Sequence, residues 1–199
     1  KLREEFPDKI IVADMKIMDA GRIEVEIAAK SGANIVCVLG AASDSTIKEC
    51  VEAAHNYGAK IQADLIAVKD VKKRAIEVVR LGVDYVGIHC SIDDQMAAKN
   101  HFKELKDIAS HISTPIAVAG GINSETAPDA VKGGASIVIV GGAINKSKDA
   151  KKATEEIKRS MNRLKKIKTA LFKRGAEKDI AKILMEVSCA NLSDAMHRQ

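Results

Sequence analysis

A glycine-containing tetrapeptide that joins a helix-like stretch to a strand-like run recurs four times along the chain. This repeated joint constrains the fold more than any other feature. Helix-like stretches end in a glycine-containing tetrapeptide that leads into a short run of β-branched and other apolar residues. Glycine at such a joint can supply the left-handed cap that ends a helix. The four joints are SGAN (31–34), YGAK (57–60), LGVD (81–84) and GGAS (133–136).

The apolar runs and the stretches between them define six consecutive strand–helix units. The expected strands are Ile10–Ala13, Ile35–Leu39, Ile61–Leu65, Tyr85–His89, Ile116–Ala119 and Ile137–Val140. The expected helices include Glu24–Lys30, Ser45–Asn56, Val71–Arg80 and Ala127–Lys132. Units of this kind predict an α/β fold, in which helices lie outside a parallel sheet.

A doubly wound sheet and an eight-stranded barrel both consist of such units. The units here are short and regular, and no G-x-G-x-x-G sequence follows the first strand, which favours the barrel. Glycines cluster in AVAGGIN (117–123) and IVIVGGAIN (137–145), and (β/α)8 barrels usually bind phosphate after strands 7 and 8. We therefore expect a (β/α)8 TIM barrel with strands 3–8 present and strands 1 and 2 missing before Lys1. Residues 1–9 would end the helix after strand 2.

The composition suits a core of aliphatic side chains. Hydrophobic residues make up 46% of the chain, aromatic residues only 3%, and tryptophan is absent, as in α/β proteins with buried parallel sheets. Because the sequence contains neither an 18-residue apolar run nor a signal peptide, we expect a cytoplasmic protein without a membrane segment. Cys37, Cys50, Cys90 and Cys189 lack metal-site spacing and are expected to be reduced.

The net charge of +5 originates in one segment. Residues 146–174 contain 12 Lys and Arg against 3 Asp and Glu, whereas the rest of the chain contains 20 against 24. The basic pI therefore says little about the main domain. Phe172 is the only aromatic residue among these charges, so we interpret the basic face as solvated and do not expect a nucleic-acid partner.

Charged residues gather where the expected strands end, at the face that carries catalytic groups in a parallel barrel. Asp14 and Lys16 are two residues apart, so on an extended strand they point the same way. They can hold a divalent cation and an anionic intermediate, or they form a plain ion pair. His89 is either a general acid or base or a core histidine. Asp64 either binds substrate hydroxyls or anchors the following loop.

Two glycine pairs follow the last two expected strands. They are Gly120-Gly121 and Gly141-Gly142. The N–H groups of glycine loops bind phosphate oxygens because no side chain blocks close approach. By contrast, His55, His101 and His111 lie on helical or loop stretches and are expected at the surface.

The segment VADMKIMDAG (12–21) resembles the D-x-K-x-x-D motif of the orotidine monophosphate decarboxylase superfamily. Five further segments are similar to the 3-hexulose-6-phosphate synthase family and occur in that family's order, over about residues 1–158: VLGAASDSTI, ADLIAV, YVGIHCSIDDQ, AVAGGINSETAP and IVIVGGAI. The related 3-keto-L-gulonate-6-phosphate decarboxylases typically carry an arginine after the corresponding histidine. Here HCSIDDQ is nearer the synthases' H-T-G-x-D-x-Q, from which Cys90 and Ser91 depart.

The resemblance implies a reversible aldolase that condenses formaldehyde with D-ribulose 5-phosphate to D-arabino-hex-3-ulose 6-phosphate. It implies that Asp14 binds Mg²⁺, that Lys16 stabilises an enediolate, and that His89 moves the proton at the reacting carbon. Asp19 would reach the partner subunit's site, which implies a homodimer with shared active sites. Asp64 would bind the sugar substrate, and the phosphate group would be bound by Gly120, Gly121, Gly141 and Gly142.

Two further residues of the family site are an Asp after strand 1 and a Glu, a metal ligand, after strand 2. Neither is present in the chain, so we expect these 199 residues alone to be inactive or very weak. Two alternatives remain open. One is a 3-keto-L-gulonate-6-phosphate decarboxylase, and the other is an RNA-associated regulator that uses the basic segment and the C-terminal residues.

The chain is expected to divide into three parts. Residues 1–157 would form the barrel, 158–178 a basic helical linker, and 179–199 the beginning of another domain. The segment VSCANLSDAMHR (187–198) resembles the opening of a domain shared by the ribonuclease-activity regulator A and related aldolases, which some archaeal synthases carry C-terminally. Abundant Lys and Ile with few Gln also suggest a thermophilic or archaeal source.

Overall fold

Six parallel strands form one sheet in the part of the chain that the computed structural model describes, residues 1–91 and 102–169. Each strand pairs with the next in sequence order. The strands are β1 (Val12–Ile17), β2 (Ile35–Leu39), β3 (Lys60–Asp64), β4 (Tyr85–His89), β5 (Ile116–Ala119) and β6 (Ile137–Ile139).

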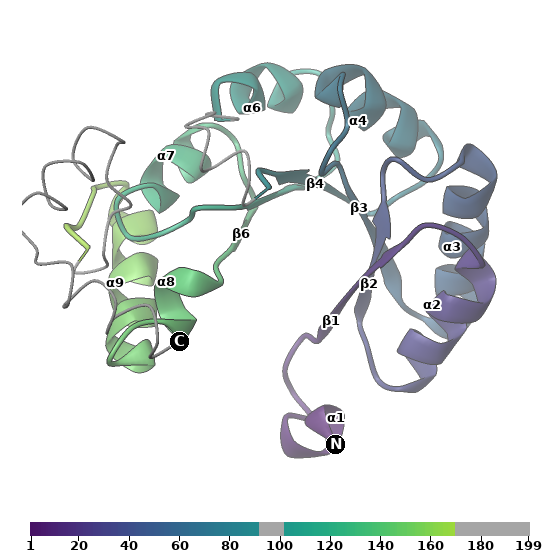
Figure 1. Ribbon diagram of the computed structural model, residues 1–199, viewed down its shortest axis with the longest axis horizontal. Coiled ribbons are helices and arrows are strands. Elements are labelled where there is room, and N and C mark those ends of the chain that lie inside the picture. The colour runs from purple at the N-terminus through teal and green to yellow at the C-terminus, as the bar shows by residue number, and fades with distance from the viewer. Residues whose placement is uncertain (92–101, 170–199) are drawn as a thin grey trace, which may run out of the picture. The chain divides into compact units, whose positions relative to one another are not determined.

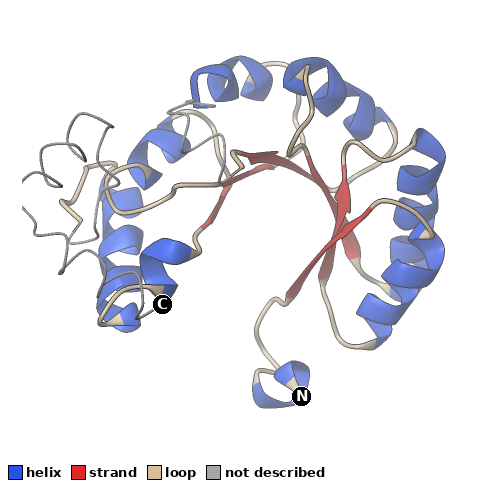
Figure 2. Ribbon diagram, viewed as in Figure 1, coloured by secondary structure: helices blue, strands red, loops and turns tan. Residues whose placement is uncertain are grey.

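The sheet is curved, and helices α2, α3, α4, α6 and α7 cover its convex face (Figures 1 and 2). A doubly wound sheet would carry helices on both faces and would reverse its strand order, so that alternative is wrong. The arrangement is a TIM-barrel-like half-barrel, whereas the two strands expected before Lys1 stay a prediction. The described helices are α1 (Leu2–Glu5), α2 (Gly21–Lys30), α3 (Asp44–Tyr57), α4 (Val71–Arg80), α6 (Phe102–Ala109), α7 (Ala127–Lys132), α8 (Gly142–Asn145) and α9 (Ala150–Arg163).

The glycine joints between helices and strands have the predicted left-handed backbone. Gly32, Gly58, Gly82 and Gly134 have φ angles of 97°, 69°, 96° and 107°. Only glycine adopts such angles without steric cost. The joints therefore end four helices and return the chain to the sheet, as predicted.

Strand β1 differs from its predicted range, Ile10–Ala13. It begins at Val12 and continues to Ile17, so Asp14 and Lys16 lie within the strand. Its pairing with β2 shifts register between Ala13 and Ile17, and Lys16 has a φ of 50°. The strand is therefore not regularly extended here, although the side chains of Asp14 and Lys16 still meet, as predicted. A bulge of this kind redirects side chains, and the apolar pattern does not reveal it.

The core consists of aliphatic side chains, as predicted. Val36, Val38, Ile61, Val86 and Val118 on the strands are 0–1% exposed. On the helices, Val25, Ile47, Val78 and Leu105 are also fully buried. Cys37, Cys50 and Cys90 are buried free thiols, while Cys189 lies outside the described residues. Within residues 1–91 and 102–169, no helix is both long and apolar enough to cross a bilayer.

Helix α9 ends before the expected basic linker does. Its last residue is Arg163, and Leu164 then adopts a left-handed backbone with a φ of 50°. Residues 165–169 continue without helix, so the helical prediction for 158–178 fails from residue 164 to 169. The remainder of that range and the expected domain at 179–199 lie outside the described residues. His55 and His111 are exposed, as predicted, and His101 is not described.

Candidate active site

Four charged or titratable side chains from β1, β3 and β4 meet near the carboxyl ends of β3 and β4. Nζ of Lys16 lies 2.9 and 3.0 Å from the two carboxylate oxygens of Asp14 and 2.8 Å from Oδ2 of Asp64. The same Oδ2 lies 2.9 Å from Nδ1 of His89. Asp64 and His89 each end their strand, so the parallel sheet brings them to one edge.

Asp64 is the centre of this cluster. Its side chain is only 5% exposed, and its Oδ1 accepts a hydrogen bond from the backbone N–H of Ile66. Burial alone would raise the pKa of this carboxyl, but hydrogen bonds from His89 and Lys16, with the nearby positive charge, lower the pKa below its usual value. Asp64 is therefore ionised at neutral pH. The sequence left two roles open for Asp64, which were to anchor the following loop or to bind substrate hydroxyls. The carboxylate does anchor the loop, through Ile66, and it also faces the charged cluster.

Lys16 connects two carboxylates from a strained backbone position. Burial would lower the pKa of its ammonium, but hydrogen bonds and charges from Asp64 and Asp14 raise it. A left-handed φ at a non-glycine residue costs about 1–2 kcal/mol, and such strain persists where the surrounding structure enforces it. The bulge in β1 therefore carries an ammonium group that is charged at neutral pH and faces both carboxylates.

Among the described residues, His89 is hydrogen-bonded through Nδ1 to Asp64, which leaves Nε2 available for proton transfer. With Nδ1–H donating to the ionised Asp64, the neutral imidazole carries its lone pair on Nε2. The side chain is 22% exposed. A histidine oriented by a carboxylate in this way can accept and return a proton, which favours the acid–base interpretation over that of a core histidine.

Cys37 lies beside the cluster and was not singled out from the sequence as a site residue. Burial, together with the negative charges of Asp14 and Asp64, raises the pKa of its thiol to about 12. The thiol therefore stays protonated and packs as a small apolar side chain rather than acting as a nucleophile. Successive residues of a strand point to opposite faces of the sheet, so Cys37 lies on the face opposite to Val36 and Val38. This alternation is the sequence signal that could have placed Cys37 on the same face as the cluster.

Asp19 is not part of the cluster. It follows the end of β1, is exposed, and its Oδ1 accepts a hydrogen bond from the backbone N–H of Ala20 at 2.8 Å. The structure therefore brings Asp14, Lys16, Asp64 and His89 together and leaves Asp19 outside.

The two glycine pairs follow β5 and β6, which are neighbours in the sheet. Gly120 and Gly121 have φ angles of 97° and 69°, and a Cβ on Gly120 would overlap the carbonyl oxygen of Cys90. A Cβ on Gly141 would meet nothing within 4 Å among the described atoms. Gly120 is thus required by the fold, whereas within residues 1–91 and 102–169 the N–H groups of Gly141 and Gly142 donate to no backbone carbonyl.

A divalent cation would find an oxygen ligand in Asp14, whose side chain is 58% exposed. Residues 1–91 and 102–169 contain no group of three or more His, Cys, Asp or Glu side chains that could enclose a metal ion. Mg²⁺ often binds through one or two carboxylates and completes its shell with water and substrate oxygens. Asp14 fits that incomplete mode of binding.

Comparison with known proteins finds similar sequences and similar structures. The model of the orotidine 5'-phosphate decarboxylase / HUMPS family matches residues 1–157. The 3-hexulose-6-phosphate synthase of Bacillus subtilis (strain 168) is 42% identical over 159 residues, which cover 79% of this chain and 76% of that protein. A crystal structure of a 3-hexulose-6-phosphate synthase superposes with a TM-score of 0.76 at 39% identity, covering 80% of this chain and 77% of the other.

The solved structure of a protein named for another activity, KGPDC (3-keto-L-gulonate-6-phosphate decarboxylase), is also similar. KGPDC from Streptococcus mutans superposes with a TM-score of 0.72 at 26% identity, covering 82% of this chain and 77% of that chain. The identity to the synthase structure is higher by 13 percentage points, 39% against 26%. The fold is common to both, and the higher identity favours the synthase.

Proposed function

The chain belongs to the orotidine 5'-phosphate decarboxylase / HUMPS family, and on that premise we propose that it is an aldolase. The reaction condenses formaldehyde with D-ribulose 5-phosphate to D-arabino-hex-3-ulose 6-phosphate and is reversible. The similarity to the Bacillus subtilis synthase supports this substrate class. The observation that carries the proposal is the shared oxygen of Asp64, which fixes a cation and an imidazole side by side.

The proposed chemistry begins with proton removal from C1 of ribulose 5-phosphate. His89 accepts that proton on Nε2, while Asp64 stabilises the imidazolium that forms. The electron pair passes to the C2 oxygen, and the Lys16 ammonium stabilises the resulting enediolate. C1 then attacks the carbon of formaldehyde, a C–C bond forms, and the new alkoxide takes the proton back from His89.

Asp14 would hold Mg²⁺, which supplies further positive charge beside the enediolate oxygens. The glycine loops after β5 and β6 would bind the phosphate group through backbone N–H groups, away from the reacting carbon. Phosphate held at that distance orients the sugar without taking part in bond making. Asp19, which is exposed and outside the cluster, would act in the site of a second subunit of a homodimer.

The second candidate is 3-keto-L-gulonate-6-phosphate decarboxylase, favoured by the similarity to KGPDC. Both reactions pass through an enediolate, so the cluster suits either. The two differ in the one-carbon fragment that leaves, which is formaldehyde from the hexulose phosphate and CO₂ from the keto-acid phosphate.

The experiment that separates them uses the full-length protein with both substrates. We expect formaldehyde release from hex-3-ulose 6-phosphate, loss of this activity with a chelator, and recovery with added Mg²⁺. An Asp14→Asn variant should need a higher Mg²⁺ concentration for half-maximal rate. CO₂ release from the keto-acid phosphate, with no formaldehyde from the hexulose phosphate, would establish the decarboxylase instead.

A further inference from the structure

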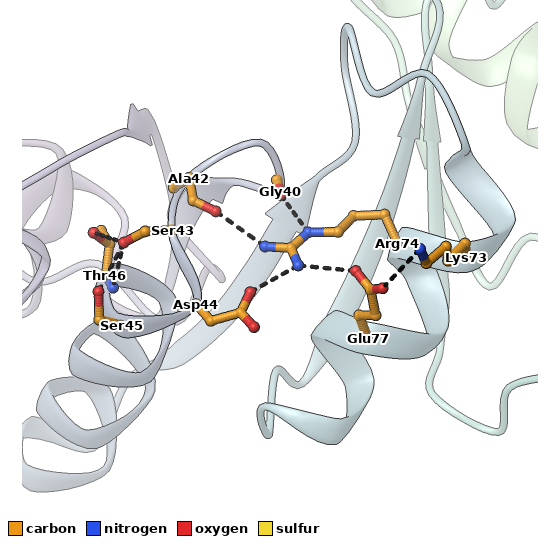
Figure 3. A network of polar contacts seen from close by, with 9 residues as sticks. All are labelled: Gly40, Ala42, Ser43, Asp44, Ser45, Thr46, Lys73, Arg74 and Glu77. Atoms are coloured by element: carbon orange, nitrogen blue, oxygen red, sulfur yellow. Dashed lines mark hydrogen bonds and ion pairs between the residues drawn. The ribbon is translucent and has the colours of Figure 1, made fainter.

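Arg74 on α4 makes four polar contacts with the segment after β2 and with its own helix (Figure 3). Its Nε–H donates to the carbonyl oxygen of Gly40 at 2.7 Å, and Nη2–H donates to that of Ala42 at 3.0 Å. Nη1–H donates to Asp44 at 2.7 Å and to Glu77 at 3.0 Å. One guanidinium thus joins helix α4, the β2–α3 loop (residues 40–43) and the start of α3.

The two carbonyl groups depend on Arg74. Gly40 and Ala42 are buried, and within residues 1–91 and 102–169 no other N–H or O–H group donates to either carbonyl oxygen. A buried acceptor without a partner costs about 1–3 kcal/mol. Loss of the guanidinium would therefore leave two buried acceptors of the β2–α3 loop without a partner.

The guanidinium is itself fixed in place. The Arg74 side chain is 16% exposed. Burial would lower its pKa, but hydrogen bonds and charge from Asp44 and Glu77 raise it. The planar fork of arginine can reach two carbonyls and two carboxylates at once, which a lysine ammonium cannot do from one position.

The loop held by Arg74 in turn holds Asp64. The N–H of Gly40 donates to the carbonyl oxygen of Asp64 at 2.7 Å. A Cβ on Gly40 would overlap the side chain of Leu65 and come within 3.2 Å of the Asp64 carbonyl oxygen. Gly40 is therefore packed directly against the peptide that follows the central carboxylate.

We propose that Arg74 is a positioning residue, which fixes the Asp64 carboxylate against Lys16 and His89 by anchoring the β2–α3 loop through Gly40 and Ala42. The polar contacts of its guanidinium are with the loop, Asp44 and Glu77, not with the charged cluster itself. Its effect passes from the guanidinium to the Gly40 carbonyl, and from the Gly40 N–H to the Asp64 backbone. The kinetic part of this inference depends on the proposed aldolase activity, whereas the structural part does not.

The test compares Arg74→Met with Arg22→Met in the full-length protein. Arg22 also donates to two carboxylates of α3, those of Glu49 and Glu52, and among the described residues its side chain bonds to no loop carbonyl. We expect Arg74→Met to lower kcat by about 10²-fold, since misplacing a catalytic group by about 1 Å costs that much. The KM for the sugar phosphate should change little, and Arg22→Met should leave both constants unchanged.

Hydrogen exchange of the Gly40 amide supplies a readout that does not depend on activity. We expect this amide to exchange faster in Arg74→Met than in the parent protein or in Arg22→Met. An unchanged exchange rate, or an unchanged kcat per folded molecule, would overturn the inference. A parent protein that turns over neither substrate would refute the proposed function, and the Gly40 amide would still decide the positioning role.

A double variant separates the hydrogen bonds of Arg74 to the loop carbonyls from its ion pairs, and Arg74→Lys serves if Arg74→Met does not fold. Asp44→Asn with Glu77→Gln removes both charges around the guanidinium and leaves the carbonyl bonds, so kcat should stay within about 3-fold of the parent value, because half-exposed ion pairs contribute about 0–1 kcal/mol. If Arg74→Met does not fold, Arg74→Lys decides the matter. Its single ammonium should lower kcat by about 10-fold, and parent-like kinetics would contradict the proposal.

Discussion

Nζ of Lys16 lies 2.8 Å from Oδ2 of Asp64, although the strands that carry them are not neighbours in the sheet. Strand β2 separates them, so the lysine side chain crosses the concave side of the sheet to reach the carboxylate. The contact is made from the bulge at Lys16, where φ is 50° and the β1–β2 register shifts. A backbone irregularity thus places the ammonium group of the cluster.

Replacing that ammonium should remove activity without unfolding the protein. Lys16→Met keeps much of the aliphatic length and loses the charge that would stabilise the enediolate. We expect kcat to fall by about 10²–10³-fold, the usual loss when one stabilising donor is removed. Lys30→Met, which removes an exposed lysine paired with Glu26, is the control and should keep full activity. Steady-state kinetics with hex-3-ulose 6-phosphate measure both.

The fold was predictable because its signals are local. Gly32, Gly58, Gly82 and Gly134 end helices through their own backbone freedom, and aliphatic runs identify buried strands without knowledge of their partners. Strand β1 was misjudged because Asp14 and Lys16 interrupt the apolar pattern that defines a strand. The Arg74 network was not visible in the sequence because it joins residues 30 to 34 positions apart, and no periodicity encodes such a contact.

The contribution of Asp64 to stability should depend on acidic pH. Its pKa is lower in the folded protein than in the unfolded chain, because His89 and Lys16 favour the carboxylate. The stabilisation is therefore complete above the unfolded pKa of about 3.9 and is lost as the pH falls through the lower, folded value. Asp64→Asn should lower the free energy of unfolding by about 1–3 kcal/mol at pH 7. The difference between the parent protein and the variant should shrink below about pH 4.

Urea unfolding of the parent protein and Asp64→Asn between pH 7 and pH 2 measures this effect. Other carboxyl groups titrate in both proteins, so the difference between the two isolates Asp64. A difference that stays constant down to pH 2 would show that Lys16 and His89 do not lower the pKa of this carboxyl.

The glycine pairs after β5 and β6 should respond differently to an added methyl group. In Gly120→Ala the new Cβ overlaps the carbonyl of Cys90 at a φ of 97°, so we expect a loss of at least about 1–2 kcal/mol of stability. In Gly141→Ala the Cβ meets nothing within 4 Å, so stability should change by less than about 0.5 kcal/mol. A rise in KM for the sugar phosphate in Gly141→Ala would support phosphate binding there.

The buried thiols should be unreactive in the folded protein. Burial raises the pKa of both Cys37 and Cys50 to about 12, with nearby carboxylates adding to the effect. Since the thiolate is the reactive form, iodoacetamide at pH 8 should leave both unmodified until the protein unfolds. Peptide mass spectrometry with and without urea would locate the label. Rapid labelling of Cys37 in the folded protein would mean that the cluster beside it is open to solvent.

The segment after α9 should stabilise the β5–α7 loop, which also carries the Gly120-Gly121 pair. Ser124 is 4% exposed, its Oγ–H donates to the carbonyl oxygen of Ile167 at 2.7 Å, and its own carbonyl accepts the Ile167 N–H at 3.1 Å. Nearby, Lys166 forms an ion pair with Asp129 at 2.7 Å. These contacts tie residues 166 and 167 to the β5–α7 loop and to the helix that follows it.

Ser124→Ala should therefore destabilise the protein by about 1 kcal/mol, because it removes the hydrogen bond between the buried Ser124 hydroxyl and the half-buried carbonyl of Ile167. Ser110→Ala is the matched control, since Ser110 also donates to a carbonyl at 2.7 Å, that of Asp107, but at an exposed position where water can replace the hydroxyl. Its cost should be below about 0.5 kcal/mol. Equal losses in the two variants, measured by urea unfolding, would show that the segment after α9 contributes nothing through Ser124.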